Sequence, residues 1–219
     1  MASVVPSFSP MLASSGPVAA PASAWAFEPK LDGWRVLVSV DGDPTVRTRH
    51  GHKVTASVPE LLPIVTALEG RSVVLDGELV ARQGRPLDFS GLAPRLSAHA
   101  PASVARRRAR MPVTFAAFDV LYLDGDTVTL LPYLERRAVL EGLGLTGPAW
   151  CMVLSVIGDG PELMAACAQF GLEGLVAKRL DSIYRPGERS KQWVKVKCPD
   201  WRVHHAPRQL SEGRTPIAK

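Results

Sequence analysis

The chain has 219 residues, of which 46% are hydrophobic and 21% are charged, and its formal net charge is +5. This length can bury the core of one large domain, or of one domain with a small appendage. The positive charge is compatible with nucleic-acid binding and favours it only slightly. The sequence shows no apolar run long enough for a membrane span and no signal-peptide pattern. We therefore expect a cytoplasmic, nucleoid-associated location without membrane contact.

Three cysteines, Cys151, Cys167 and Cys198, are far apart in the sequence. No Cys-x-x-Cys pair is present, so neither a zinc ribbon nor a disulfide scaffold is supported, and thiols in a reducing compartment are expected. The sequence also lacks a Gly-x-x-x-x-Gly-Lys-[Ser/Thr] loop and a Gly-x-Gly-x-x-Gly turn. A nucleotide would therefore be held in neither the P-loop nor the Rossmann manner.

The predicted elements mix strands and helices without a regular alternation. Residues 1–24 are rich in Ser, Pro and Ala and are expected to be an irregular lead-in. Periodicity and turn residues then predict strands at Trp25–Lys30 and Trp34–Asp41, joined by an Asp-Gly turn, a strand at Thr45–Arg49, a helix at Pro59–Leu68 and a strand at Ser72–Ala81. Short helices at Asp88–Leu96 and Val104–Arg110 and a strand at Val113–Tyr122 are predicted next. The last predicted elements are a helix at Pro132–Leu143, a strand at Trp150–Val156, a helix at Pro161–Phe170, and strands at Gly174–Lys178 and Trp193–Lys197.

This order favours an α+β fold with largely antiparallel sheets over a doubly wound parallel sheet. One domain is expected over residues 25–198. The remainder, residues 199–219, is polar and is expected to be an irregular tail.

The stretch Lys30-Leu31-Asp32-Gly33-Trp34-Arg35 contains the first candidate for chemistry. Lysine can act both as a nitrogen nucleophile and as a phosphate ligand. A lone Lys-x-Asp-Gly-x-Arg is weak evidence, because a lysine on a polar loop is usually only solvated. The motifs that follow in the chain strengthen the functional interpretation.

Strand periodicity sorts the polar residues of two later motifs by face. Asp76 and Glu78 share one face of their strand, which suits a metal or ribose hydroxyls, although a solvent-facing edge is the alternative. Trp193, Lys195 and Lys197 share a face of the last strand. Two ammonium groups about 7 Å apart along a strand can straddle a phosphate, although a charged outer face is again the alternative.

Three further features complete the set of candidates. Phe118 lies in an apolar strand, either as a core aromatic or as a stacking surface for a base. Glu173-Gly174-Leu175-Val176-Ala177-Lys178 contains a carboxylate at the start of a strand and a lysine that is either a surface residue or a phosphate contact. The arginines between residues 106 and 110 favour a solvated helix face, with a DNA-backbone contact as the minority interpretation. His50 and His52 have no apparent third partner for a metal.

In this order and spacing, the motifs resemble the ATP-dependent DNA ligases, within the lysine nucleotidyl-transferase superfamily. The resemblance covers roughly residues 8–198. The segments Ser9-Pro10-Met11-Leu12-Ala13 and Tyr184-Arg185-Pro186-Gly187-Glu188-Arg189-Ser190 are most similar to small bacterial ligases and to the ligase module of bacterial end-joining enzymes. The resemblance implies two mainly antiparallel sheets with flanking helices around a nucleotide cleft, which is the architecture of a ligase adenylation domain.

The resemblance also implies a role for each matching residue. Lys30 would attack the α-phosphate of ATP and carry AMP, with Lys195 and Lys197 stabilising charge on that phosphate. Glu28 and Phe118 would border adenine, Arg35 and Glu78 would hold the ribose, and Arg49 would touch phosphate. Glu173, together with Glu78, would hold Mg²⁺ or Mn²⁺. The implied reaction transfers AMP to the 5′-phosphate of nicked duplex DNA in repair or recombination.

The ligases that the chain resembles continue into an OB-fold domain, for which Cys198–Lys219 are too short. We therefore expect an adenylation domain with the OB fold absent, or supplied by a partner or end-joining protein. Two alternatives remain open: an RNA ligase or capping-type nucleotidyl transferase, and a truncated relic that binds ATP or DNA ends without sealing them.

Overall fold

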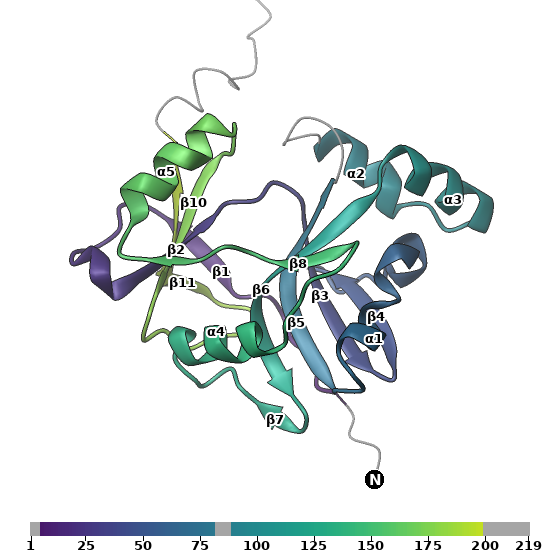
Figure 1. The fold of residues 1–219 in the computed structure, drawn as a ribbon, viewed down its shortest axis with the longest axis horizontal. Helices are drawn as coiled ribbons and strands as arrows, with labels where there is room; N and C mark the ends of the chain where they lie inside the picture. Colours follow the sequence, from purple (N-terminus) through teal and green to yellow (C-terminus); the bar gives the residue numbers. More distant parts are fainter. Residues whose placement is uncertain (1–4, 82–88, 199–219) are drawn as a thin grey trace, which may run out of the picture.

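The computed structural model describes residues 5–81 and 89–198, which form two β-sheets flanked by helices (Figure 1). The first sheet has the strand order β1-β11-β10-β2-β9. The second has the order β4-β3-β5-β6-β7, with β8 also paired to β6. The pairs β1–β11 and β6–β8 are parallel and the other described pairs are antiparallel. The predicted α+β fold with two mainly antiparallel sheets is confirmed.

The first sheet is built from β1 (Leu12–Ser15), β2 (Trp25–Pro29), β9 (Val156–Ile157), β10 (Gly174–Arg179) and β11 (Arg189–Lys197). The second sheet is built from β3 (Trp34–Asp41), β4 (Asp43–Thr48), β5 (Val73–Ala81), β6 (Val113–Leu123), β7 (Asp126–Thr127) and β8 (Trp150–Met152). The α-helices are α1 (Ile64–Ala67), α2 (Phe89–Leu96), α3 (Pro101–Arg110), α4 (Tyr133–Gly142) and α5 (Gly160–Gln169), and short 3₁₀ turns cover Ala22–Ala24, Thr55–Ser57 and Pro59–Leu61.

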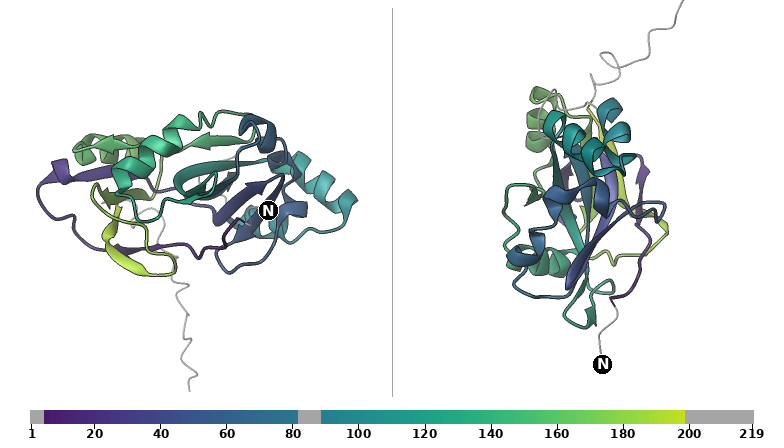
Figure 2. Two further views of the ribbon diagram at one scale, coloured as in Figure 1. Left: turned by 90° about the horizontal axis from the view of Figure 1, so that it is seen from below. Right: turned by 90° about the vertical axis from the view of Figure 1, so that its right-hand side faces the viewer.

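Apolar side chains form three layers, and the sheets share the middle one. The first sheet packs its outer face against α5 through Phe27, Leu163 and Val194. The second sheet packs its outer face against its own helices, through a larger cluster that includes Val36 and Leu75. The inner faces meet in a small cluster formed by Met11, Leu37, Val74, Leu121, Tyr122, Tyr184 and Trp193. Figure 2 (left) shows α5, in green, and α3, in teal, at opposite ends of this arrangement.

The segment expected to be an irregular lead-in contains a strand. Leu12–Ser15 pairs in parallel with β11, whose residues lie more than 170 positions later in the chain. The irregular assignment was wrong for these four residues, because local composition does not report so distant a partner. The segment 1–4, the start of the predicted helix at residue 88, and the expected tail 199–219 lie outside the described residues.

Three other expectations differ from the structure. Strands β2 and β3 do not form a hairpin across the Asp-Gly turn, because they belong to different sheets. The predicted strand Trp150–Val156 is split between β8 in the second sheet and β9 in the first. The predicted helix Pro59–Leu68 is divided into Pro59–Leu61 and α1, because Pro63 has no N–H to continue the helical hydrogen bonds. No helix within residues 5–81 and 89–198 is long and apolar enough to cross a membrane.

Gly77 lies between Asp76 and Glu78 in β5, where the pairing with β6 is irregular. A Cβ atom there would overlap the Phe115 ring and would lie 2.6 Å from the Ala116 carbonyl oxygen. The residue must therefore be glycine for β5 and β6 to approach each other closely.

We expect Gly77→Ala to lower the free energy of unfolding by about 1–3 kcal/mol, as overpacking of a closed core does. For a domain of this size the melting temperature should fall by roughly 2–4 °C per kcal/mol. Gly142→Ala is the matched control, because nothing lies within 4 Å of its Cβ position at the end of α4. Differential scanning calorimetry of both variants is the measurement. An equal effect of the two substitutions would contradict the steric explanation.

Candidate active site

A cavity of about 300 Å³ opens between the inner faces of the two sheets, beside their shared apolar cluster. Both sheets and the connection between β2 and β3 contribute to its wall. Its lining consists of Leu12, Ala13, Glu28, Pro29, Lys30, Leu31, Asp32, Gly33, Arg35, Arg49, Glu78, Phe118, Val176, Lys178, Trp193 and Lys195. The wall thus combines cations, carboxylates and two aromatic rings, which suits a ligand with a phosphate group and a planar base.

Lys30 follows the end of β2, and its backbone N–H donates to the Gly174 carbonyl at 2.8 Å. Its ammonium group forms an ion pair with one oxygen of the Glu173 carboxylate. The other oxygen of Glu173 pairs with Lys197 Nζ at 2.7 Å. Burial alone would raise the pKa of Glu173, but the hydrogen bonds from Lys197 and Lys30 lower it below its ordinary value. An ionised Glu173 therefore joins two of the predicted phosphate-handling lysines.

Lys195 lies on the same strand as Lys197 and lines the cavity. Burial lowers the pKa of Lys195, and repulsion from the Lys30 ammonium lowers it further. Three lysine ammonium groups thus share a small region with one carboxylate between two of them. Such a region has an excess of positive charge and attracts a polyanion.

A second ion pair lies deeper in the cavity wall. Lys178 Nζ is 2.8 Å from Glu28 Oε2, and both side chains are almost fully buried. Tyr133 donates its hydroxyl hydrogen to Glu28 Oε1 at 2.7 Å, and Lys178 also donates to the Phe118 carbonyl at 2.9 Å. Burial raises the pKa of Glu28 and lowers the pKa of Lys178, and each charge opposes the shift of the other. The alternative that Lys178 is a surface residue is therefore wrong.

Arg35 extends from β3 across the inner face of the second sheet. It donates two hydrogen bonds of 2.5 Å to the buried Asp76 carboxylate, which also accepts one from Tyr184. The Arg35 guanidinium lies 4.4 Å from the centre of the Phe118 ring. Trp193 meets Phe118 edge-on, with ring centres 6.4 Å apart. These contacts fix the orientation of the Phe118 ring at the cavity.

Glu78 lies two residues beyond Asp76 on the same face of β5, as the sequence predicted, and borders the cavity rather than an outer surface. Burial raises its pKa to about 7, against the opposing effect of Arg35 and with a contribution from the Asp76 charge. Glu78 therefore changes charge near neutral pH, unlike an ordinary exposed carboxyl group.

The structure brings most of the sequence-predicted site residues to one cavity. The residues that line it are Glu28, Lys30, Arg35, Arg49, Glu78, Phe118 and Lys195. Glu173 joins them through its ion pair with Lys30, and Lys197 through its ion pair with Glu173. Within the described part of the chain, no group of three or more His, Cys, Asp and Glu side chains is arranged as a metal site. Glu173 and Glu78 are thus not part of a protein-only metal cage of three or more such side chains among the described residues.

Sequence reasoning missed the buried partners of these residues. Lys178 has the same strand parity as Val176, which is paired with Glu28 in the register of β10 and β2. That parity is a signal that could have placed Lys178 on the inner face. Tyr133 comes from the first turn of α4, and no local pattern connects it with Glu28, 105 residues earlier.

Comparisons with known proteins agree with this geometry. Residues 10–197 match the profile of the ATP dependent DNA ligase domain. The chain belongs to this family. It is 41% identical over 192 residues to the multifunctional non-homologous end joining protein LigD of Mycolicibacterium smegmatis, a match that covers 87% of this chain and 24% of LigD. It is 37% identical over 180 residues to a DNA ligase of Thermococcus onnurineus, covering 78% of this chain and 32% of that ligase.

Solved structures show the same family likeness. The ligase domain of LigD from M. tuberculosis superimposes with a TM-score of 0.71 at 38% identity, covering 87% of this chain and 60% of that one. A mycobacterial DNA ligase D complexed with ATP and MES gives a TM-score of 0.70, also at 38% identity and with the same coverage. The adenylated DNA ligase of Chlorella virus, at 16% identity and a TM-score of 0.60, shares the fold. This ligase-family chain spans about a quarter to a third of the length of the first two relatives.

The raised pKa of Glu78 predicts a pH-dependent stability. Because folding raises this pKa from 4.5 to about 7, the folded protein binds the proton more tightly between these values. The contribution of protonated Glu78 to the stability of the folded protein is fully present below about pH 4.5 and is lost as the pH rises through 7. The side chain of the Glu78→Gln variant stays neutral at every pH. The free energy of unfolding of this variant, relative to that of the natural protein, should therefore rise by about 1–2 kcal/mol between pH 5 and pH 8, after allowance for partial solvent exposure.

Thermal unfolding of both proteins across this pH range is the measurement. The control is Glu135→Gln, which removes an exposed carboxyl group in the first turn of α4. That substitution should leave a difference in melting temperature that does not depend on pH. A Glu78→Gln difference that is constant, or that shrinks as the pH rises, would overturn the assignment.

Proposed function

We propose that this chain is the adenylating part of an ATP-dependent DNA ligase, with Lys30 as its nucleophile. The observation that supports this most is the position of the Lys30 ammonium group. It lies at a cavity whose wall combines cationic side chains with an aromatic ring that is held in place by its neighbours. A nucleoside triphosphate needs these two environments at opposite ends of one molecule.

The chemical step is an exchange of bonds at the α-phosphorus of ATP. Lys30 Nζ forms a P–N bond while the P–O bond to pyrophosphate breaks, and the attacking nitrogen loses its protons to solvent. In the structure the Lys30 side chain is occupied by its ion pair with Glu173. This pair must therefore separate when ATP enters, and the ATP phosphates then become the partners of Lys195 and Lys197. Positive groups that face the α-phosphate stabilise the charge that develops there.

In this proposal, the part of the cavity beside Phe118 binds adenine. Phe118 offers a half-buried ring, held in place by Arg35 and Trp193. The Glu28 carboxylate is already held by Lys178 and Tyr133, so the position of this carboxylate is fixed before the base arrives. Arg35, Glu78 and Arg49 also line the cavity and would contact the ribose and the phosphates.

The donor set also fits a divalent cation that arrives with the nucleotide. Mg²⁺ is typically held by one or two carboxylates, with substrate phosphates and waters completing the shell. Glu173 is ionised beside Lys30 and supplies such a carboxylate, with Glu78 as the second candidate. When bound, Mg²⁺ or Mn²⁺ would neutralise charge on the triphosphate.

The later steps transfer AMP from Lys30 to the 5′-phosphate of a nick, and the 3′-hydroxyl then displaces AMP. LigD is named as an end-joining protein, and this chain resembles its ligase part over 192 residues. We therefore propose nicked duplex DNA in double-strand break repair as the substrate. An OB-fold or end-joining partner protein, from the same polypeptide or another, would complete the enclosure of the DNA.

Lys30 is expected to become covalently adenylated. Incubation with ATP and Mg²⁺ followed by peptide mass spectrometry should find AMP on the peptide that contains Lys30, and Lys30→Ala should abolish the adduct. Lys191→Ala is a matched control, because this lysine is exposed on β11 outside the cavity. An adduct on another lysine, or no adduct with either Mg²⁺ or Mn²⁺, would exclude Lys30 as the nucleophile.

Phe118→Ala should weaken ATP binding by roughly fivefold to tenfold, because aromatic stacking contributes about 1 kcal/mol beyond burial. The melting temperature should change far less than for a core residue, since Phe118 is half-buried. Isothermal titration of ATP and GTP to both proteins tests the base preference. Stronger labelling of Lys30 by GTP than by ATP would favour a capping-type nucleotidyl transferase over a DNA ligase.

A further inference from the structure

Helix α3 bears a group of arginines that the proposed reaction does not use. Arg106, Arg107, Arg108 and Arg110 lie in its last five residues. The surrounding sequence 89–112 contains no Asp or Glu. Within residues 5–81 and 89–198, no carboxylate forms an ion pair with any of these four side chains. Four like charges so close together repel one another, so the group gains stability when a polyanion approaches.

Three of these arginines surround one recess. Arg106, Arg107 and Arg110 line a hollow of about 350 Å³ between α2 and α3, together with Pro94, Arg95 and Met111. The Arg95 side chain is almost fully buried and donates to both oxygens of Glu60, at 2.8 and 2.7 Å. Its charge is therefore compensated from within, and it anchors α2 beneath the hollow. The charges of the other three stay available to a ligand.

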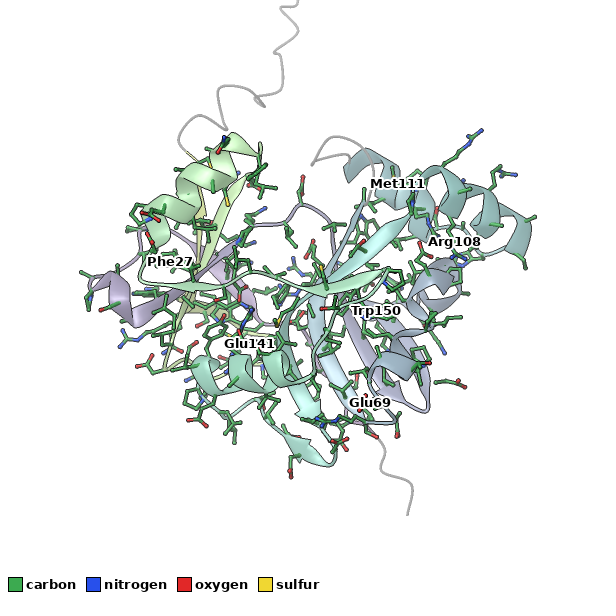
Figure 3. The ribbon with its side chains drawn as sticks, in the orientation of Figure 1. Phe27, Glu69, Arg108, Met111, Glu141 and Trp150 are labelled. Carbon is green, nitrogen blue, oxygen red and sulfur yellow. The ribbon has the colours of Figure 1, made fainter. Side chains whose placement is uncertain are left out.

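The spacing on the helix suits a nucleic-acid backbone. Arg106 and Arg110 are four residues apart and project from the same face, about 6 Å from each other along the axis. Charges along one strand of a duplex follow one another at about 3.4 Å along its axis, so the two arginines span about two phosphates. Figure 3 shows Arg108 on α3, where its side chain is exposed.

The location of α3 agrees with such a role. The connection from β2 to β3, which carries Lys30 and Gly33 at the cavity, lies on the same side of the molecule as α2 and α3 (Figure 1). A duplex that lies across the cavity with its 5′-phosphate near Lys30 can therefore extend toward α3. The recess itself is separate from the cavity, since no residue lines both.

We propose that the arginines of α3 form a DNA-backbone contact that is separate from the adenylation cavity and holds the duplex on one side of the nick. This inference rests on the proposed function for the presence of a nick. The contact reads phosphates and not bases, so it is independent of sequence. It contributes to the affinity for DNA and leaves the reaction with ATP unchanged.

The test variant is Arg106→Gln/Arg110→Gln, and the matched control is Arg71→Gln/Lys191→Gln, which removes the same charge from exposed positions outside α3. Fluorescence anisotropy with a labelled nicked duplex, over a series of salt concentrations, gives the affinity and its salt dependence. We expect the test variant to bind about tenfold more weakly at low salt, and the slope of log K against log salt to fall by about 2. The control should change neither quantity appreciably.

Two further measurements separate this inference from the proposed function. The rate of Lys30 adenylation by ATP without DNA should be the same in the test variant and the natural protein, which also shows that the variant is folded. If Lys30 is never adenylated but the test variant still loses DNA affinity, the proposed function fails and the arginine contact stands. If adenylation occurs and both double variants bind DNA equally well, the arginine contact is overturned. Binding of polyglutamate, lost in the test variant without any change in DNA affinity, would assign the surface to an acidic protein instead and would also overturn it.

Discussion

The Asp76 carboxylate is the interaction on which the geometry of the site depends. It is fully buried, it accepts two hydrogen bonds from Arg35 in the same sheet, and it accepts a third from Tyr184, which precedes β11 of the other sheet. Tyr184 in turn accepts from the Met11 backbone N–H before β1. One carboxylate thus connects both sheets at the side of the cavity. Removing a partner from such a buried pair typically costs about 3–5 kcal/mol, because it leaves an uncompensated charge.

The same contacts explain why the cavity is polar although it lies between two sheets. The shared apolar cluster of the inner faces is small, and beyond it the alternation of β3, β5 and β11 places charged side chains on the inner side. Charges at the cavity are compensated by one another, as in the pair Arg35–Asp76 between β3 and β5 and the pairs Glu28–Lys178 and Glu173–Lys30 beside them. The protein therefore holds the gap open with paired charges, and a triphosphate can exchange one of these partners without exposing an unpaired group.

The sequence predicted those parts of the fold and site that local pattern determines. Alternation within one strand placed Asp76 and Glu78 together and separated Trp193 and Lys195 from Val194, and the structure agrees. The pairing of β1 with β11 and the contact of Tyr133 with Glu28 join residues more than a hundred positions apart. No local signal reports them. The division of β2 and β3 between two sheets was missed for a related reason, because an Asp-Gly turn is the usual signal of a hairpin. Here Gly33 instead allows the chain to pass against β5, where a Cβ would overlap the Leu79 carbonyl oxygen.

That crossing gives Lys30 its chemical environment. Had β2 and β3 formed a hairpin, the Lys30 side chain would extend from a loop into solvent, where its charge needs no partner. Because the connection passes from one sheet to the other, Lys30 is 17% exposed, and its amine meets Glu173 at the start of β10 in the first sheet. The following residues lead into β3 and carry Arg35 to Asp76 and Phe118 in the second sheet. Six consecutive residues therefore place the proposed nucleophile on one wall of the cavity and the support of the aromatic ring on the other. The closeness of Lys30 and Arg35 in the sequence is thus a requirement of the two-sheet architecture: a short connection fixes the distance between the two ends of a bound nucleotide.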